Sequence, residues 1–484
     1  MVPSFQSLPD ILDALSTEAP PAVPRAPGLV LLNEGLATDL GLDPGWLASE
    51  QGTAWLAGGP LDGSPIPRAF AYAGHQFGGF VPLLGDGRAA LLGELRDAGG
   101  RAWQVQLKGA GRTPYSRPGS DGRAWLGPVL REYVISEAMH ALGIPTTRAL
   151  AVASTGSSVL RERPWPGAVL TRVSRGLVRV GTVEFLSYRG DLESMTQLVQ
   201  HCLDRHFPDA EAGPSPASTL LAHVGQRQAS LVAQWLAVGF IHGVMNTDNC
   251  SIPGETLDYG PCAFLDTYHP ETAFSSIDHY GRYAYANQPR IAHWNLAALA
   301  QALLPILDRE HAQEVLDQFP NWFAAAHESQ MRRKLGLGTE APDDGALAAD
   351  LLSVMDRSDA DFTRTFRALS HLGVQPGPAD EDLRAEFADG RALDSWVQRW
   401  RARVSQEECS DTTRQQEMLK VNPAVIPRNH QIEHLIQAAV LGDHAPLMRL
   451  MRALSTPFVL QPQDHDLSQP PASGERVYQT FCGT

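Results

Sequence analysis

The sequence predicts an α+β protein of two lobes, in which a small β-rich N-lobe precedes a large helical C-lobe and each end carries an extension. The long strand-like segments lie before about residue 175, and helical apolar spacing dominates after about residue 190. With 484 residues, 43% of them hydrophobic, the chain can bury a core that extends over more than one lobe. The expected parts are an N-terminal extension over 1–65, an N-lobe over 66–170, a C-lobe over 171–460 and a tail over 461–484 with Cys482.

Composition narrows the class of protein. The net charge of −15 argues against a broad nucleic-acid-binding surface. The five cysteines have no paired spacing, which indicates neither a disulfide framework nor a zinc motif and favours a reducing compartment. The first residues lack the pattern of a signal peptide, and the most apolar run, 231–245, is too short to span a membrane. We therefore expect a cytoplasmic protein that binds neither nucleic acid nor membrane. A monomer is the expected oligomeric state, although composition does not determine it.

A glycine-rich turn precedes the first clear strand. Residues 89–95 have the apolar pattern of a strand, and the turn before them contains Gly85, Gly87 and Arg88. Glycines let a backbone approach a ligand closely, and an arginine beside them can meet a phosphate. An ordinary hairpin turn explains the same residues. Asp121-Gly122, further along the chain, is likewise either a plain turn or a ligand loop.

A lysine ends the next strand, and a helix with two glutamates follows. Residues 103–108 alternate as a half-buried strand does and end at Lys108, and 129–142 have helical spacing. In a kinase, a lysine at this place binds phosphate and a helical glutamate holds it. Glu132 is the better candidate for that pair because it is nearer the start of the helix, and Glu137 is expected to be a solvated charge. The alternative for Lys108 is a surface lysine before a turn.

Strands are expected at 146–153 and 167–173, and two arginines lie at the end of the second strand and after it. Arg172 and Arg179 are seven residues apart, so on a helix they would share one face. Converging on a nucleotide, they would bind its phosphates through paired N–H donors. A basic surface patch is the alternative. Further helices are expected over 230–241, 295–307, 312–326, 346–355, 380–403 and 429–441.

The stretch 242–266 contains three polar residues suited to a metal ion and phosphate: Asp248, Asn249 and Asp258. The sequence CSIPGETL between the last two predicts a tight hairpin around its Pro-Gly pair, which would bring Asn249 and Asp258 side by side. An amide oxygen and a carboxylate are hard ligands that suit Mg²⁺ or Mn²⁺.

This layout is similar to the catalytic loop of protein kinases followed by their Asp-Phe-Gly metal site, with Asn249 as the loop asparagine and Asp258 as the first residue of an Asp-Tyr-Gly motif. A kinase has its catalytic aspartate five residues before that asparagine, where this chain has Val244. Valine cannot accept a proton, and Asp248 is the nearest replacement. The sequence therefore predicts a protein-kinase-like bilobal fold whose nucleotide site does different chemistry.

The chain resembles the selenoprotein O (YdiU) family in eight ordered motifs from about residue 65 onward: AYAGHQFG, LGDGRA, QLKGAGRTPYSR, SDGRA, SEAMHALGIPTTRAL, HGVMNTDNCSI, LDYGPCAFLD and VNPAVIPRNH. The resemblance implies a protein-kinase-like fold that binds ATP in a flipped orientation. It also implies transfer of AMP to Ser, Thr or Tyr hydroxyls of protein substrates. For bacterial members it further implies transfer of UMP from UTP with Mn²⁺.

Carried over by motif, the resemblance assigns roles to single residues. Asp248 would accept the proton, Asn249 and Asp258 would bind Mg²⁺ or Mn²⁺, and Glu132 would pair with Lys108. The residues implied to contact the nucleotide are Gly85, Gly87, Arg88, Lys108, Asp121, Gly122, Arg172, Arg179 and Asp258.

The chain departs from the family at its cysteines. Many members end in a redox motif, whereas Cys482 has no neighbouring partner, and serines occupy the stretch where some members have a second cysteine. Cys250 and Cys262 are expected to be inert core residues because their surroundings are apolar. This departure puts redox control of the protein in doubt.

Two other functions stay open at this point. A small-molecule kinase would use the same scaffold, but Val244 argues against it because those enzymes keep the catalytic aspartate there. A non-catalytic nucleotide-binding or redox adaptor is the second alternative. The intact set of Lys108, Glu132, Asn249 and Asp258 argues against a dead site.

Overall fold

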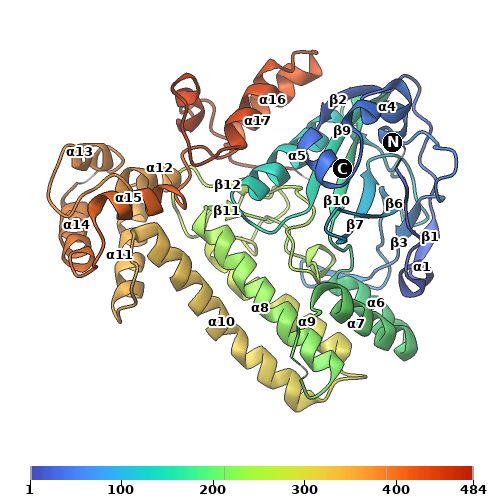
Figure 1. Ribbon diagram of the computed structural model, residues 1–484, viewed down its shortest axis with the longest axis horizontal. Helices are drawn as coiled ribbons and strands as arrows, with labels where there is room; N and C mark the ends of the chain where they lie inside the picture. Colours follow the sequence, from blue (N-terminus) through green and yellow to red (C-terminus); the bar gives the residue numbers. More distant parts are fainter. Residues whose placement is uncertain (1–2, 212, 389, 482–484) are drawn as a thin grey trace.

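An eight-stranded antiparallel sheet forms one end of the computed structural model, which describes residues 3–211, 213–388 and 390–481 (Figure 1). The strand order is β1–β3–β6–β7–β10–β9–β2, and β8 pairs with β10 beside this path. The strands are β1 (Ser16–Glu18), β2 (Gly28–Leu32), β3 (Arg68–Phe70), β6 (Ala89–Arg96), β7 (Ala102–Lys108), β8 (Ala124–Trp125), β9 (Arg148–Leu160) and β10 (Pro164–Ser174). Two small pairs are separate from it: β4 (Gly74–Gln76) with β5 (Gly79–Val81), and β11 (Phe240–Ile241) with β12 (Ala263–Phe264).

Most helices follow the sheet in sequence, so the fold is a mixed α/β fold with its strands concentrated early. Five helices lie before β9: α1 (Asp10–Ala14), α2 (Glu34–Asp39), α3 (Pro44–Leu47), α4 (Glu50–Leu56) and α5 (Leu126–Ala141). The next are α6 (Val180–Arg189), α7 (Leu192–His206), α8 (Pro216–Ala237), α9 (Gln288–Leu303) and α10 (Arg309–Leu335). The last are α11 (Asp344–Arg357), α12 (Phe362–Leu369), α13 (Ala379–Arg384), α14 (Gly390–Val404), α15 (Asp411–Leu419), α16 (Asn429–Val440) and α17 (Ala445–Leu454).

Both faces of the sheet are covered, which explains the long apolar runs in its strands. Helix α5 packs on β9 and β10, and its buried side chains join the main core. Helices α2 to α4 cover the other face, where Leu47 and Trp55 meet Val105 and Leu107 of β7. The strands predicted at 89–95, 103–108, 146–153 and 167–173 and the helix predicted at 129–142 are all confirmed.

The first part of the chain contributes to this sheet directly. Strand β1 pairs with β3 at one edge, and β2 pairs with β9 at the other. Main-chain pairing at both edges satisfies N–H and C=O groups that would otherwise be exposed there. The N-terminal segment is therefore built into the sheet by hydrogen bonds as well as by side-chain packing.

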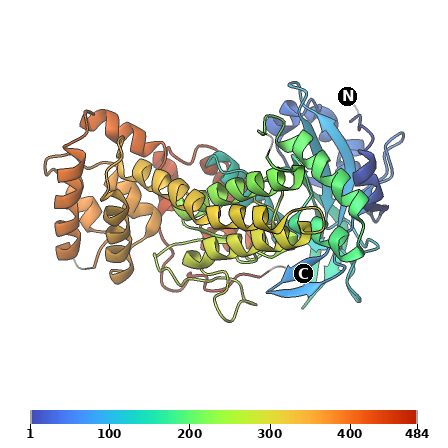
Figure 2. The same ribbon diagram turned by 90° about the horizontal axis from the view of Figure 1, so that it is seen from below.

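Helices α8, α9 and α10 lie side by side in both views, and α11 to α15 gather at the end of the molecule remote from the sheet (Figures 1 and 2). The helices predicted over 295–307, 312–326, 346–355 and 429–441 are confirmed, with boundaries shifted by several residues. The helix predicted over 230–241 ends earlier, at Ala237, because Gly239 has φ +74° and the chain turns there into β11. The segment 380–403 forms two helices, and the second buries Trp396 and Trp400 in a core of its own.

The prediction of a tight hairpin between Asn249 and Asp258 is wrong. A turn does form, since the Gly254 N–H donates to the Ser251 carbonyl at 3.2 Å. The two arms pair with other segments and not with each other: Ser251 bridges Arg179, and Thr256 bridges Thr146. Tertiary partners for the backbone thus replace the local pairing that the Pro-Gly signal suggests.

A buried arginine ties the last third of the chain to the loop after Asp258. The Arg428 guanidinium contacts Asp266 at 2.5 Å and Asp361 at 2.9 Å, and it donates to the Ser468 carbonyl at 3.1 Å. It lies between α15 and α16, in a stretch where Pro423 and Pro427 interrupt the helical pattern. None of the described helices has the length and apolarity needed to cross a bilayer.

Lys334, at the end of α10, gives a prediction about stability. Its ammonium is buried, donates to Asn422 Oδ1 at 2.8 Å and lies 4.0 Å from the centre of the Phe366 ring. Burial lowers the pKa of Lys334 to about 7. An unfolded lysine has a pKa of about 10.4, so between these values the unfolded chain binds a proton that the folded chain does not, and stability rises with pH.

We expect the free energy of unfolding of the native chain to increase between pH 7 and pH 9 by a few kcal/mol more than that of Lys334→Met. Urea unfolding at the two pH values measures the difference. Equal pH dependence in both proteins would contradict the burial of a titrating lysine.

Candidate functional site

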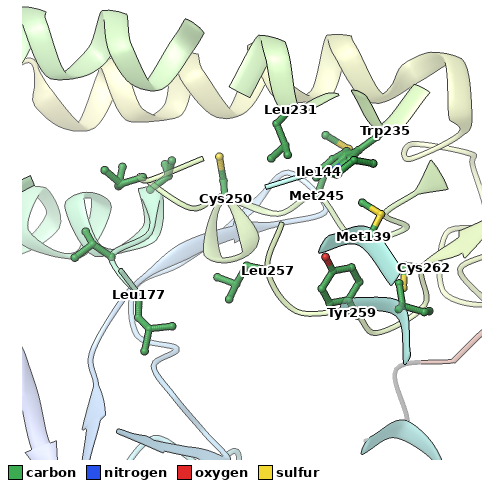
Figure 3. Close-up of a cluster of buried hydrophobic side chains, with 14 of the residues drawn as sticks. Met139, Ile144, Leu177, Leu231, Trp235, Met245, Cys250, Leu257, Tyr259 and Cys262 are labelled. Atoms are coloured by element: carbon green, nitrogen blue, oxygen red, sulfur yellow. The ribbon is translucent and has the colours of Figure 1, made fainter. Parts of the chain in front are cut away.

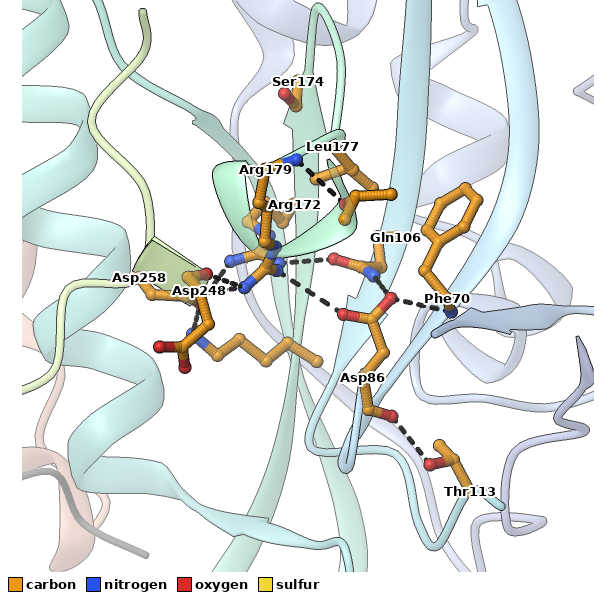
Figure 4. Close-up of polar contacts among 12 residues, drawn as sticks. Phe70, Asp86, Gln106, Thr113, Arg172, Ser174, Leu177, Arg179, Asp248 and Asp258 are labelled. Atoms are coloured by element: carbon orange, nitrogen blue, oxygen red, sulfur yellow. Dashed lines mark hydrogen bonds and ion pairs between the residues drawn. The ribbon is translucent and has the colours of Figure 1, made fainter. Parts of the chain in front are cut away.

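Three cations converge on one carboxylate at the loop before β12 (Figure 4). Asp258 Oδ1 lies 2.5 Å from Lys108 Nζ and 2.6 Å from Arg172 Nη1, and Asp258 Oδ2 lies 3.0 Å from Arg179 Nη1. Lys108 ends β7, Arg172 lies on β10, and Arg179 directly precedes α6. The contacts therefore join two strands, a helix start and the loop at one point.

A second carboxylate holds the lysine in place. Glu132 of α5 contacts Lys108 Nζ at 2.7 Å and Arg172 Nη1 at 3.5 Å. Burial alone would raise the pKa of Asp258, but Lys108, Arg172 and Arg179 outweigh it and hold that pKa well below its usual value. Asp258 also has φ +64°, in the left-handed region that aspartate tolerates better than most residues. The side chain is 19% exposed, so the cluster opens to solvent on this side.

Behind the cations lies a layer of buried polar groups. Arg172 Nη2 donates to Gln106 Oε1 at 2.5 Å, and Gln106 Nε2 donates to Asp86 Oδ2 at 2.9 Å. Asp86 Oδ1 lies 3.4 Å from Arg179 Nη2, while burial raises the Asp86 pKa despite that arginine. These bonds fix the planes of both guanidinium groups, which leaves their remaining donors in defined directions.

Asp248 lies beside the cluster in the short helix Thr247–Asn249. Its carbonyl accepts from Arg179 Nη1 at 2.7 Å, so one arginine contacts both Asp248 and Asp258. Its carboxylate accepts from Gln76 Nε2 at 3.2 Å, and Oδ1 is buried without a partner among the described residues. Burial, opposed by Arg179, raises the Asp248 pKa to about 6. An unpaired buried carboxylate oxygen is costly, which is typical of a functional position.

The oxygen atoms of Asn249 and Asp258 are ligands of the kind that a hard divalent metal ion prefers. Asn249 Nδ2 donates to the Val244 carbonyl at 3.0 Å, and this bond leaves the amide oxygen for another partner. With the Asp258 carboxylate, it offers two oxygen ligands, and phosphate oxygens would complete the set. No cluster of three or more His, Cys, Asp or Glu side chains around a metal site occurs in the described residues. A metal ion here would therefore depend on a bound nucleotide.

The loop that carries these residues is rooted in an apolar core (Figure 3). Cys250, Leu257 and Tyr259 are next to the polar residues of the loop and belong to the same buried cluster as Leu231 and Trp235 of α8. Cys250 and Cys262 are both buried, and burial raises the Cys250 pKa to about 12, so the prediction that they are core residues is confirmed. Cys482 lies outside the described residues.

The hairpin of β4 and β5 covers the Asp248 side of the site. Besides the Gln76 bond, the His75 N–H donates to Thr247 Oγ1 at 2.6 Å and the Phe77 N–H donates to Asn246 Oδ1 at 3.0 Å. Phe77 and Gly78 form its two-residue turn with φ values of +52° and +89°. Such turns favour Asn-Gly, so an aromatic residue is strained at this position. Phe77 remains 38% exposed.

The remaining residues predicted to contact the nucleotide belong to two turns, and their contacts are with other parts of the fold. Gly85 and Gly87 pack against Tyr115, since a Cβ on Gly85 would lie 2.4 Å from that ring. Arg88 is half-buried in the same turn. Asp121 pairs with Arg161 at 3.1 Å, and this contact does not involve the three cations. A Cβ on Gly122 would lie 2.2 Å from a backbone oxygen, so a larger residue cannot replace that glycine without movement.

Two sequence expectations at this site are wrong. Arg172 and Arg179 do not share a helix, because Arg172 is in β10 and Arg179 precedes α6, yet both reach the same carboxylate. Glu137 is not solvated: it is buried and accepts from Arg148 Nη2 at 2.7 Å and from Asn33 Nδ2 at 2.7 Å. Partners distant in sequence stabilise its charge, and helix spacing alone does not reveal them.

Asp86, Gln106 and Gln76 are neighbours of the cluster that the sequence patterns did not identify. For Gln106 the sequence contains a signal. It is a polar residue in β7, two residues before Lys108 and on the same face of the strand, and its side chain is buried. Asp86 lies between Gly85 and Gly87, in the glycine-rich turn that the sequence predicts to approach a ligand. Gln76 had no local signal, because its role depends on the contact with Asp248.

Fixed cations beside carboxylate and amide oxygens are typical of enzymes that transfer phosphate-containing groups. A family model described as "Protein adenylyltransferase SelO" matches residues 5–455. The chain is 52% identical to "Protein nucleotidyltransferase YdiU" of Bradyrhizobium diazoefficiens, over 99% of this chain and 98% of the relative. Proteins of the same name from Methylorubrum populi and Methylorubrum extorquens are 53% and 54% identical, over 99% and 96% of this chain and 98% and 96% of the relatives.

The chain belongs to the SelO (YdiU) family, a family of nucleotidyltransferase enzymes. The resemblance seen in the motifs is thereby confirmed. It also extends further than the motifs did, because the family match includes the N-terminal segment that forms β1 and β2.

The ion cluster predicts how Asp258→Asn changes stability. Removing the carboxylate leaves three cations close together, so we expect a loss of about 3 kcal/mol in the free energy of unfolding. ATP without a divalent ion should then raise the melting temperature of the variant more than that of the native chain, because its phosphates supply the missing negative charge. Differential scanning fluorimetry measures both shifts.

Asp317→Asn is the matched control, because Asp317 is exposed on α10. It should change neither value. A variant at Asp258 that is as stable as the native chain would contradict a role for this carboxylate in neutralising the cations.

Proposed function

We propose that this chain transfers AMP from ATP to Ser, Thr or Tyr hydroxyls of proteins and releases pyrophosphate. The observation that carries the proposal is the convergence of Lys108, Arg172 and Arg179 on Asp258, with Asp248 held beside them by Arg179. The printed names of the relatives, protein adenylyltransferase and protein nucleotidyltransferase, agree with this chemistry.

The three cations would bind the triphosphate. A nucleotide triphosphate carries several negative charges, and burying them requires cations that are already desolvated and oriented. Glu132 and Gln106 orient the cations through the contacts described above. In the orientation proposed here, the β- and γ-phosphates lie inward at these cations and the α-phosphate faces the opening. Gly85, Gly87, Arg88, Asp121 and Gly122 would contact the rest of the nucleotide.

Asn249 and Asp258 would hold a divalent cation, Mg²⁺ or Mn²⁺, together with phosphate oxygens. When bound, such an ion neutralises charge on the phosphates and on the departing pyrophosphate. Asp258 keeps a low pKa because of the neighbouring cations and would therefore be ionised whenever a ligand enters.

Asp248 would take the proton from the acceptor hydroxyl as its oxygen attacks the α-phosphorus. The bond from the α-phosphorus to the bridging oxygen then breaks, and pyrophosphate leaves toward the cations. Gln76 and Arg179 keep Asp248 in position through its carboxylate and its carbonyl. Val244 occupies the place where protein kinases have their base, so Asp248, directly before Asn249, is the nearest acidic replacement.

We further propose that the architecture is the protein-kinase-like bilobal fold and that the protein acts in the cytoplasm as a monomer. Two features support the fold assignment. Lys108 of a strand pairs with Glu132 of a helix, and the loops that contain Asn249 and Asp258 follow α8. Exposed aromatic residues support a protein acceptor, because a polypeptide offers apolar side chains to meet them. Phe77 and Phe80 belong to the hairpin that contacts Asp248 through Gln76, and the centre of the Tyr188 ring of α6 lies 5.7 Å from that of Phe80.

The donor chemistry predicts which phosphorus is transferred. With ATP labelled in turn on the α- and γ-phosphate, Mg²⁺ or Mn²⁺ and a generic protein acceptor, label should reach protein only from the α-position. Labelled UTP in a parallel reaction compares the two donors. Label from the γ-position would mean a kinase and would overturn the flipped nucleotide.

The base assignment predicts that Asp248→Asn lowers the transfer rate by about 10²- to 10⁴-fold and leaves nucleotide affinity nearly unchanged. Rapid-quench transfer and equilibrium nucleotide binding separate the two effects. Asp258→Ala should abolish metal-dependent transfer, while Asp317→Asn should retain it. Full activity of Asp248→Asn would remove Asp248 as the proton acceptor.

A further inference from the structure

A second pocket lies on the loop that joins Asn249 to Asp258. Its volume is about 280 Å³, and the turn at Pro253 and Gly254 forms part of its wall. None of the three cations around Asp258 lines it. The polar side chains that do line it come from four parts of the fold: Arg175 after β10, His206 at the end of α7, Arg227, Ser230 and Gln234 on α8, and Glu255 on the loop.

Two guanidinium groups give this pocket positive charge. Arg227 donates to the carbonyls of Pro253 at 3.0 Å and His206 at 2.5 Å, which are neutral acceptors. Within the described ranges, neither Arg175 nor Arg227 forms an ion pair with a carboxylate. Burial lowers the Arg227 pKa, the charge of Arg175 lowers it further, and the charge of Glu255 opposes both, so the two cations are close enough to repel each other.

The surrounding groups cancel this charge only in part, because Glu255 attracts both arginines. His206 is buried, and burial together with Arg205 and Arg227 lowers its pKa to about 2, so it stays neutral. Glu255 is the acidic residue of the described lining, and burial raises its pKa to about 7. Its Oε2 atom accepts from Ser174 Oγ at 2.8 Å and from the Arg175 N–H at 3.2 Å, so it is already engaged.

Two buried nitrogens near the pocket also lack partners. His206 Nε2 and Arg205 Nη2 form no hydrogen bond with the described residues. Arg205 pairs with Glu94 and donates its Nε to the Arg175 carbonyl at 2.8 Å, which fixes the backbone that presents Arg175. A chain with a net charge of −15 thus places two arginines and one neutral histidine in the lining of one cavity.

We propose that this pocket binds a phosphate-bearing anion between Arg175 and Arg227. Guanidinium groups match phosphate oxygens with paired N–H donors, and a bound dianion would remove the repulsion between the two arginines. Ser230 and Gln234, 3.2 Å apart, add a hydroxyl and an amide at the same wall. The cavity is at the small end for ligand sites, which favours a free phosphate or a small phosphate ester over a whole nucleotide.

The position of the pocket couples it to the first site. Arg227 holds the Pro253 carbonyl, and two residues before Pro253 the chain pairs with Arg179 through Ser251. The Ile252 N–H donates to the Val178 carbonyl at 3.0 Å in the same stretch. An anion bound to Arg227 therefore stiffens the segment between Asn249 and Asp258 and the backbone that positions Arg179. It acts as an effector of the nucleotide site without entering it.

The location of the anion is tested in crystals of the full chain soaked in tungstate, a phosphate mimic with strong anomalous scattering. We expect one peak between Arg175 and Arg227 that persists in Arg172→Gln and disappears in Arg175→Gln. Peaks confined to the cluster of Lys108, Arg172 and Arg179 would overturn the proposal.

Solution binding supplies an independent test with inorganic phosphate, pyrophosphate and glycerol phosphate at constant ionic strength. Calorimetry of the native chain should resolve a site that Arg175→Gln weakens at least tenfold, while ATP affinity stays unchanged. Arg290→Gln, which removes an exposed arginine from α9, is the matched control and should bind as the native chain does. Comparison of the three probes distinguishes a free phosphate from an ester.

Arg227→Gln should also abolish the binding, but it removes two structural hydrogen bonds, so Arg175→Gln is the variant that decides. Hydrogen exchange reports the coupling: phosphate should slow exchange of amides 251–257 in the native chain and not in Arg175→Gln. Equal phosphate binding by the native chain and Arg175→Gln would reject the site. Because these readouts are binding and exchange, they hold whether or not the proposed transfer reaction is found.

Discussion

The whole arrangement depends on neutralising three cations at one buried point. Isolated charges of this kind are strongly disfavoured away from water, so each needs a carboxylate within contact distance. Asp258 contacts all three, Glu132 adds a second charge to Lys108, and Asp86 faces Arg179. These residues come from a turn, two strands, two helix regions and a loop. The cluster therefore forms only when the sheet, α5 and the loop after α8 are assembled together.

The same requirement suits the cluster to bind phosphate. The guanidinium groups are held by Gln106, Asp86 and the Asp248 carbonyl, so little reorganisation is needed when a negative ligand arrives. The loop keeps its polar residues in place because its apolar residues are anchored under α8 (Figure 3). One side of this loop presents Asp248 and Asp258, and its turn at Pro253 borders the second positive pocket. A single loop thus lies between two concentrations of positive charge.

Sequence patterns predicted the helices and strands correctly more often than they predicted the tertiary contacts between them. Period-two alternation located β7 and ended it at Lys108, and helical spacing located α5 with Glu132. The same reasoning failed for Glu137, because a buried glutamate and a solvated one have the same helical spacing. It also failed for the Pro-Gly hairpin, since local turn signals do not report that Ser251 pairs with Arg179 and Thr256 with Thr146. Asp86 and Gln76 were missed for a related reason: both acquire their roles through partners far away in sequence.

The sequence by itself determined the mixed fold class, the order of most elements, the family and the residue types of the candidate site. Those features depend on local spacing and on motifs that are contiguous in the chain. Only the tertiary structure decided that Arg172 from a strand and Arg179 from a helix start meet at the two oxygens of Asp258. It alone placed Arg175 and Arg227 at one cavity. The physical reason is that ion pairs and cavities depend on distances in space, and residues 79 to 150 positions apart have no local pattern that encodes them.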